Sequence, residues 1–229
     1  MKVSIAGHLV ELLPEKAAWL EATRTLLVAD VHVGKESHFH AHAIPVPPGM
    51  RHDDLARLSR LLAARPARRL VVLGDWIHSR HALTPEVERD VTAWRTRQAG
   101  VEVVLVRGNH DRGAGRLPAS WKISECDRIE EHEWVFRHEP DTRKTGFVFC
   151  GHQHPCVRLG YGRGPRERLP CFVLRPRELV LPAFGSFTGG HPVWPGRGRR
   201  IFAVTDSSVL EVGEAPNHEP GPDDYAPGG

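Results

Sequence analysis

The most restrictive feature of this sequence is the regular alternation of apolar runs and helical patterns in its first half. Largely apolar runs at residues 25–29, 70–73 and 101–106 are typical of strands that are covered on both faces. Between them, leucines recur at helical spacing over residues 50–64, and residues 86–98 predict a second helix. Strands and helices that alternate in this way, with short connections, predict a parallel sheet with helices on its faces.

The rest of the chain predicts short strands instead of long helices. Residues 3–13 indicate two strands around Gly7, and residues 14–20 indicate a short helix with Pro14 in its first turn. From residue 133 onward, turns rich in Gly, Pro and Arg separate strand candidates at 133–137, 146–150, 156–159, 171–174, 179–181, 201–204 and 209–212. We therefore expect a second, mainly antiparallel sheet packed on the first. The fold class is α/β, a two-sheet β-sandwich of mixed parallel and antiparallel strands flanked by helices.

Length and composition favour a single domain. The 229 residues are enough for one large domain, which we place at residues 1–213. Residues 214–229 are rich in Pro and Gly, with four acidic residues and no Lys or Arg, so we expect a disordered acidic tail. Because no apolar run is long enough to span a membrane and the start lacks the apolar core of a signal peptide, we expect a cytoplasmic protein. The cysteines form no Cys-x-x-Cys pair and fit reduced thiols: Cys126, Cys150, Cys156 and Cys171.

Polar residues of a particular kind follow the predicted strands. Five blocks occur in order: Asp30-Val31-His32, Gly74-Asp75, Gly108-Asn109-His110-Asp111, His138, and Gly151-His152-Gln153-His154-Pro155. In open α/β sheets, sites assemble at the carboxyl ends of strands, so we expect these blocks to meet. In extended chain, Asp30 and His32 would point to the same side, as would His152 and His154. Carboxylate, amide and imidazole donors of this kind suit manganese, iron or zinc.

This order of blocks resembles that of the calcineurin-like metallophosphoesterases. The resemblance implies one divalent ion bound by Asp30, His32 and His154, a second bound by Asn109, His138 and His152, and Asp75 as the bridge between them. Manganese is the expected metal, with iron or zinc as alternatives. The two ions would share a water molecule, and the resulting bridging hydroxide would attack phosphorus in line. His110 would protonate the leaving alkoxide, and Asp111 would either orient His110 or cap a turn or helix.

Other polar residues near these blocks are candidates for binding the substrate. Lys35 and Arg112 flank ligand blocks, so either could contact a phosphate; as isolated basic side chains they could equally be solvated. His78 follows Asp75 closely and could reach the substrate or pack within its loop. Surface or substrate-facing positions, not metal ligation, are expected for His38, His40 and His42. Residues 185–190 lack the Lys-Ser/Thr ending of a P-loop, which favours a turn between strands.

The segments around the blocks look like those of the ligase-associated DNA damage response endonucleases, also called PdeM. The similar segments are residues 27–35, 72–79, 106–112, 138–140, 151–155 and 181–190, and the resemblance spans roughly residues 5–212. It implies a DNA phosphodiesterase or endonuclease, encoded beside an ATP-dependent DNA ligase, a helicase and an exonuclease as possible repair partners. Trp76 and Gln153 depart from the family pattern, which puts the fit of the substrate in question but not metal binding.

Charge and the ligand set leave other functions open. Residues 158–200 hold nine arginines against two acids, which favours phosphate-rich partners or forms an ordinary solvated surface. A nucleotide or other small-molecule phosphodiesterase or phosphatase would use the same ligands. A non-catalytic scaffold in a repair complex is a third possibility. Activity on DNA, on small diesters or on neither distinguishes the three.

Overall fold

A computed structural model describes residues 1–36, 50–141, 146–160, 167–186 and 188–213 of the chain. The first sheet has seven strands in sequence order: β1 (Lys2–Ile5), β2 (His8–Leu13), β3 (Ala17–Leu20), β4 (Thr25–Val28), β5 (Arg69–Val72), β6 (Glu102–Val106) and β7 (Ser124–Cys126). Strands β1 to β4 pair antiparallel, whereas β4 to β7 pair parallel. The predicted parallel sheet is therefore confirmed, and its antiparallel extension comes from the N-terminal strands.

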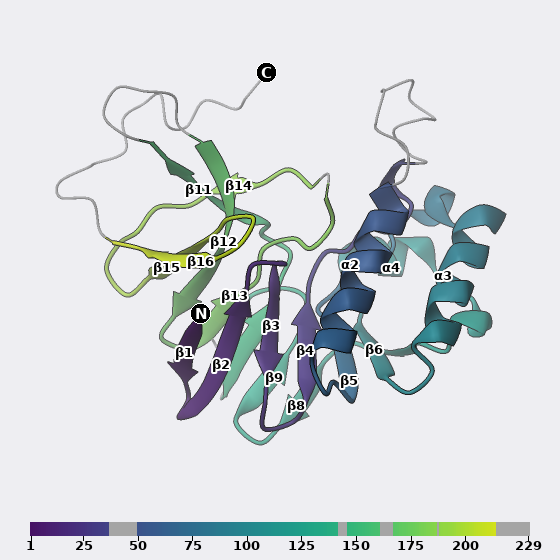
Figure 1. The fold of residues 1–229 in the computed structure, drawn as a ribbon, viewed down its shortest axis with the longest axis horizontal. Coiled ribbons are helices and arrows are strands. Elements are labelled where there is room, and N and C mark those ends of the chain that lie inside the picture. Colours follow the sequence, from purple (N-terminus) through teal and green to yellow (C-terminus); the bar gives the residue numbers. More distant parts are fainter. Residues whose placement is uncertain (37–49, 142–145, 161–166, 187, 214–229) are drawn as a thin grey trace.

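Two long helices cover one face of this sheet, as the alternating pattern predicted. Helix α2 (Met50–Ala64) follows β4, and helix α3 (Pro85–Arg97) follows β5. The side chain of Thr84 accepts a hydrogen bond from the Val87 N–H, which caps α3, and Pro85 occupies its first turn. Figure 1 shows α2 and α3 packed beside one another against β4, β5 and β6.

The predicted helix at residues 14–20 is wrong, because these residues form a tight turn and strand β3. The Lys16 N–H donates to the Leu13 carbonyl at 3.0 Å, and Lys16 has a left-handed backbone with φ of 65°. All four residues of β3 are buried, and β3 pairs with β2 on one side and β4 on the other. Pairing on both edges and burial on both faces override the helical propensity of Ala, Glu and Lys in this segment.

The second sheet contains the remaining strands and packs on the other face of the first. Its strands are β8 (Ile129–Glu131), β9 (Trp134–Phe136), β10 (Phe147–Cys150), β11 (Pro155–Leu159), β12 (Glu167–Arg175), β13 (Glu178–Val180), β14 (His191–Pro192), β15 (Arg200–Val204) and β16 (Val209–Val212). Most neighbours pair antiparallel, as predicted, but β10 runs parallel to both β9 and β13. This parallel trio matters for the site, because β9 and β10 end at the same edge.

Alternate residues of the first sheet supply two different cores. Leu26 and Val28 face the helices, where they join side chains of α2 and α3. Leu27 and Ala29 face the second sheet and pack in a cluster with Phe149 and other residues of both sheets. Since neighbouring residues of a strand point to opposite faces, burial on both faces explains why β4 reads as a continuous apolar run.

Three further sequence expectations concern membrane spans, the cysteines and the C-terminal tail. Within the described residues, no helix is long and apolar enough to cross a membrane. All four cysteines are free, and three of them are buried, as expected for reduced thiols. The predicted acidic tail, residues 214–229, lies outside the described residues.

Candidate metal centre

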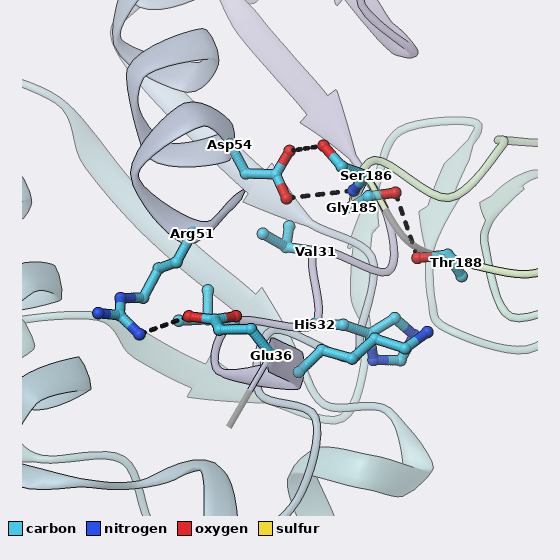
Figure 2. Close-up of a pocket in the computed structure, with 10 residues that line it drawn as sticks. Val31, His32, Glu36, Arg51, Asp54, Gly185, Ser186 and Thr188 are labelled. Atoms are coloured by element: carbon cyan, nitrogen blue, oxygen red, sulfur yellow. Dashed lines mark hydrogen bonds and ion pairs between the residues drawn. The ribbon is translucent and has the colours of Figure 1, made fainter. Parts of the chain in front are cut away.

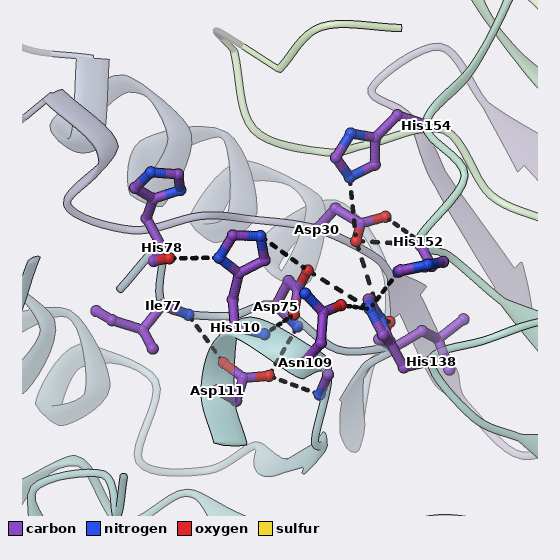
Figure 3. A network of polar contacts seen from close by, with 12 residues as sticks. Asp30, Asp75, Ile77, His78, Asn109, His110, Asp111, His138, His152 and His154 are labelled. Atoms are coloured by element: carbon purple, nitrogen blue, oxygen red, sulfur yellow. Dashed lines mark hydrogen bonds and ion pairs between the residues drawn. The ribbon is translucent and has the colours of Figure 1, made fainter. Parts of the chain in front are cut away.

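The five sequence blocks meet at one edge of the β-sandwich, where the parallel strands of both sheets end (Figure 3). Backbone hydrogen bonds continue the pairing of β4 with β5 beyond the strands. The Asp30 N–H donates to the Gly74 carbonyl at 3.0 Å, and the His32 N–H donates to the Asp75 carbonyl at 2.9 Å. In the second sheet, the Gly151 N–H donates to the carbonyl of His138 at 3.0 Å. These bonds hold the loops that carry the polar side chains in a defined register.

The first group of potential metal donors consists of Asp30, His32 and His154. One ligand atom from each lies within 4.8 Å of the others. The Nε2 atom of His154 is 3.3 Å from Asp30 Oδ1, and His32 Nδ1 is buried without a hydrogen-bond partner among the described residues. Burial lowers the pKa of His32 to about 2, with further contributions from Lys35 and His154. His32 is therefore neutral, with a ring nitrogen available to a cation.

The second group consists of Asp75, His138 and His152, with Asn109 beside it. The Nδ1–H of His138 donates to the Leu73 carbonyl at 2.9 Å, which leaves the lone pair of Nε2 facing the group. That Nε2 atom lies 3.0 Å from Asn109 Oδ1, 3.0 Å from His152 Nδ1 and 3.4 Å from Asp75 Oδ2. Lone pairs that face one another at such distances repel unless a cation lies between them. The arrangement therefore fits a shared cation.

The two groups adjoin and fit a pair of divalent cations. Asp30 Oδ1 of the first group is 3.9 Å from His138 Nδ1 of the second. Burial raises the pKa of Asp75, His138 opposes this shift, and the Asp30 carboxylate adds to it. Two buried carboxylates with few cationic partners are unfavourable unless positive charge is supplied. Buried oxygen donors, neutral imidazoles and an unpartnered ring nitrogen together meet the requirements of such ions.

The backbone of the donor residues differs from the extended conformation that the sequence predicted. Five of them have positive φ angles: Asp30 (54°), His32 (52°), Asp75 (53°), His152 (69°) and His154 (44°). Non-glycine residues adopt this left-handed conformation at a cost, and such residues cluster at functional sites. As a result, His152 and His154 join different donor groups instead of pointing to one side.

Gly74 allows the close approach of two of these segments. Its φ is +86°, and a Cβ atom at this position would lie 2.0 Å from His138 Nδ1. We expect Gly74→Ala to displace the His138 ring, to reduce metal binding and to lower the free energy of unfolding by roughly 1–3 kcal/mol. Calorimetric metal titration and urea unfolding would measure both effects. Gly113→Ala is the matched control, because Gly113 lies in a helix with no atom within 4 Å of an added Cβ. Wild-type metal stoichiometry in Gly74→Ala would contradict this account.

His110 lies beside the donor groups, where its ring is held by a backbone carbonyl. Its Nδ1–H donates to the His78 carbonyl at 2.6 Å, and its backbone N–H donates to Asp75 Oδ1 at 3.0 Å. Its Nε2 atom is consequently the one that faces the centre, 3.9 Å from Asp75 Oδ2. The His78 ring stacks on the His110 ring, with centroids 5.3 Å apart. His110 therefore presents one defined nitrogen, Nε2, to the centre.

Asp111 supports the backbone beneath the centre. It lies in helix α4 (Asn109–Ala114), and its carboxylate accepts hydrogen bonds from the N–H groups of Asp75 (2.7 Å), Ile77 (3.1 Å) and Gly108 (2.9 Å). Burial raises its pKa, and the three N–H donors oppose that shift. Of its two expected roles, the structure shows the helix cap, whereas the His110 ring is oriented by the His78 carbonyl.

The remaining substrate-binding candidates lie at different distances from the centre. Lys35 lines a small hollow together with His32. The Nη2 atom of Arg112 lies 3.7 Å from Asp127 Oδ1. The rings of His78 and His32 meet edge to face, with their centroids 5.5 Å apart. Positions 38, 40 and 42 lie outside the described residues. The described residues of the predicted turn, 185, 186 and 188–190, lie between β13 and β14.

One region beside the centre has no signal in the local sequence. Ser186 donates to the buried carboxylate of Asp54 from its N–H at 3.1 Å and from its hydroxyl at 2.6 Å, across a separation of 132 residues (Figure 2). Lys16 reaches the same loop and donates to the Gly185 carbonyl at 3.2 Å. Only the packing of α2 and the β2–β3 turn against this loop reveals that these residues lie near the centre.

Removal of metal is expected to destabilise the protein. If the donor groups bind ions present at about a hundredfold excess over Kd, chelation should lower Tm by about 5–10 °C for each ion removed from a domain of this size. Differential scanning fluorimetry with and without EDTA, followed by restoration of Mn²⁺, measures this shift. An unchanged Tm on chelation and restoration would indicate that the groups do not bind cations in the folded protein.

The fold and this constellation of donors define a class, the metal-dependent phosphoester hydrolases. Residues 23–147 match the family model of the calcineurin-like phosphoesterases, so the chain belongs to this family and is an enzyme of that class. Nuclease MPE of Pseudomonas putida is similar over nearly the whole chain. It is 40% identical, with a TM-score of 0.81 and coverage of 92% of this chain and 99% of that one.

Two other solved structures are more distant. A protein of unknown function from Aquifex aeolicus, AQ665, is 18% identical over 62% of this chain and 81% of its own, with a TM-score of 0.38. The phosphoesterase Yfce from E. coli is 16% identical over 82% of this chain and 97% of its own, with a TM-score of 0.40. A search of curated protein sequences finds no significant match.

Proposed function

We propose that this protein is a nuclease, a two-metal phosphodiesterase that cleaves DNA. The observation that carries the proposal is its 40% identity to the Pseudomonas putida nuclease over 92% of the chain. The two adjoining donor groups, which use every predicted ligand block, support the same activity. The family alone includes several substrate classes, so the nuclease relative is what favours a nucleic acid, and the resemblance to the ligase-associated endonucleases is what favours DNA.

The donor geometry supports a specific assignment of ligands. One ion would be held by Asp30, His32 and His154, whose ligand atoms form the first group. The other would be held by Asn109, His138 and His152. Asp75 would bridge the two, since its carboxylate is near His138 and shares a buried environment with Asp30.

The protein groups around the centre have distinct tasks in this proposal. Bound divalent ions would supply Lewis-acid activation of water and neutralisation of phosphate charge. His110 would give its Nε2 proton to the leaving oxygen, while its Nδ1–H bond to the His78 carbonyl stabilises the protonated ring. Asp111 would keep the backbone of Asp75 in its left-handed conformation through the hydrogen bond from the Asp75 N–H.

The proposal also includes a native metal, a cellular role, a domain and a set of substrate contacts. Manganese is the proposed native metal, with iron or zinc as alternatives that suit the same donors. A cytoplasmic role in DNA repair, beside a DNA ligase, a helicase and an exonuclease, is supported by the resemblance to the ligase-associated endonucleases. Residues 1–213 would form the whole catalytic domain. Lys35, Arg112 and His78 remain the proposed substrate contacts.

Assays with several substrates test the function. Purified protein with Mn²⁺ is expected to cleave labelled single-stranded, nicked or duplex DNA, with cleavage abolished by EDTA. Hydrolysis of bis(p-nitrophenyl) phosphate and nucleotides without any cleavage of DNA would instead establish the alternative, a small-molecule phosphodiesterase or phosphatase. Absence of all hydrolysis by metal-loaded protein would favour a scaffold.

A further inference from the structure

A cleft lined by basic side chains leads away from the metal centre on the His154 side. Its wider part has a volume of about 880 Å³ and lies between the β2–β3 turn, helix α2 and strand β12. Its narrower part, of about 110 Å³, is lined by His154 and Arg168. Lys16, Pro170 and Ser186 line both parts, so the two parts adjoin one another between His154 and α2.

The cleft carries more positive than negative charge. Its cationic side chains are Lys16, Arg57, Arg60, Arg65 and Arg168, and its acidic ones are Glu15, Glu167 and Asp206. Arg57 and Arg65 already pair with carboxylates outside this lining, Asp54 at 3.0 Å and Glu11 at 3.3 Å. For the other three cations, no ion pair is found within the part of the chain that the structure describes. Unneutralised positive charge along a cleft favours a polyanionic ligand.

Lys16 lies where the two parts of the cleft join. Its ammonium group donates to the Gly185 carbonyl at 3.2 Å, so a neutral oxygen is its hydrogen-bond partner. Burial and the neighbouring Arg57 together lower the pKa of Lys16 to about 8, against the opposing effect of Asp54. An anion beside this ammonium would offset both the burial and the neighbouring cation. The left-handed backbone of Lys16, with φ of 65°, would suit glycine better, so a lysine here is not explained by the turn.

The loop at Gly185 and Ser186, which lines the cleft, is held in place from both sides. On one side, Ser186 donates two hydrogen bonds to Asp54 of helix α2 (Figure 2). On the other side, the Gly185 N–H donates to the carbonyl of Asp30, a metal-centre residue, at 3.1 Å. A ligand that spans the centre and the cleft would therefore meet two sites in a fixed relative geometry.

From these contacts we propose that the cleft is a second phosphate-binding subsite, in which Lys16 and Arg60 hold a backbone phosphate of a nucleic-acid strand whose scissile phosphate lies at the metal centre. The inference rests on the proposed function, because a minimal diester has no second phosphate to place there. The subsite would supply affinity for the strand and fix its direction across the centre. Because contacts to backbone phosphates carry no base information, the subsite would act on any sequence.

Kinetics at varied salt concentration test the subsite. We expect Lys16→Gln to lower kcat/KM for a single-stranded oligonucleotide about tenfold more than for bis(p-nitrophenyl) phosphate, since one phosphate contact is lost. The slope of log kcat/KM against log salt concentration should fall by about one unit. Arg60→Gln should lower kcat/KM for the oligonucleotide and the salt slope in the same way. Because the Arg60 side chain is exposed, this substitution should not disturb folding.

A matched lysine provides the control. Lys122 is exposed, has a left-handed backbone with φ of 47° and lies next to Trp121, outside the cleft. Lys122→Gln removes the same charge and should keep the wild-type salt slope. Equal losses on both substrates in Lys16→Gln, or a wild-type slope in both cleft variants, would overturn the subsite while leaving the nuclease intact. Wild-type protein that hydrolyses the small diester but no oligonucleotide would instead overturn the proposed function, and with it this ligand.

Discussion

Asp75→Asn is expected to lower kcat/KM for DNA by on the order of 10³-fold or more, because the bridging carboxylate serves both ions and groups of this kind act as a unit. The substitution is nearly isosteric. It preserves an Oδ1 acceptor for the His110 N–H and leaves the backbone bond to Asp111 in place. What it removes is one negative charge between the two donor groups, so weaker metal binding should accompany the loss of turnover.

Metal content and activity have to be measured together for this variant. Mass spectrometry of metals and calorimetric titration with Mn²⁺ give the stoichiometry, and oligonucleotide cleavage gives kcat/KM. Glu130→Gln is the control: Glu130 is an exposed carboxylate of β8 that pairs with Arg128 at 3.0 Å, and its neutralisation should leave activity near the wild-type level. Activity of Asp75→Asn within a few fold of wild type would rule out a bridging role.

His110→Ala is expected to show a large dependence on the leaving group. For DNA, whose leaving alkoxide needs a proton, we expect a loss of about 10²–10⁴-fold in kcat/KM. For bis(p-nitrophenyl) phosphate, whose leaving phenolate is stable without a proton, the loss should be less than about tenfold. The physical basis is the single nitrogen that His110 presents to the centre, since its other ring nitrogen is bonded to the His78 carbonyl.

The comparison of two substrates separates proton donation from a structural effect. A misplaced centre would reduce both activities alike, whereas loss of an acid reduces only the one with the poor leaving group. His132→Ala is a suitable control, because His132 is exposed, has a left-handed backbone and precedes β9, whose opposite end leads to His138. Equal losses on the two substrates would show that His110 is not the proton donor.

Much of the fold could be predicted because its signals are local. The apolar runs of β4, β5 and β6 and the leucine spacing of α2 depend only on which faces are buried. Where burial and strand pairing oppose the helical propensity of a segment, the prediction from local sequence was wrong. Residues 17–20 read as helical but form β3, since β2 and β4 flank them on both edges.

The sequence by itself determined the donor chemistry of this protein: the residue types, their order and their position after strands. Only the tertiary structure decided how those donors divide into two groups, because left-handed backbones at His152 and His154 direct into different groups two side chains that extended chain would align. The structure also decided that Asp111 bonds to the backbone, and that Lys16 and Asp54 adjoin the centre. Contacts of this kind join segments more than 30 residues apart, and their energy depends on the packing of whole elements, which no local pattern contains.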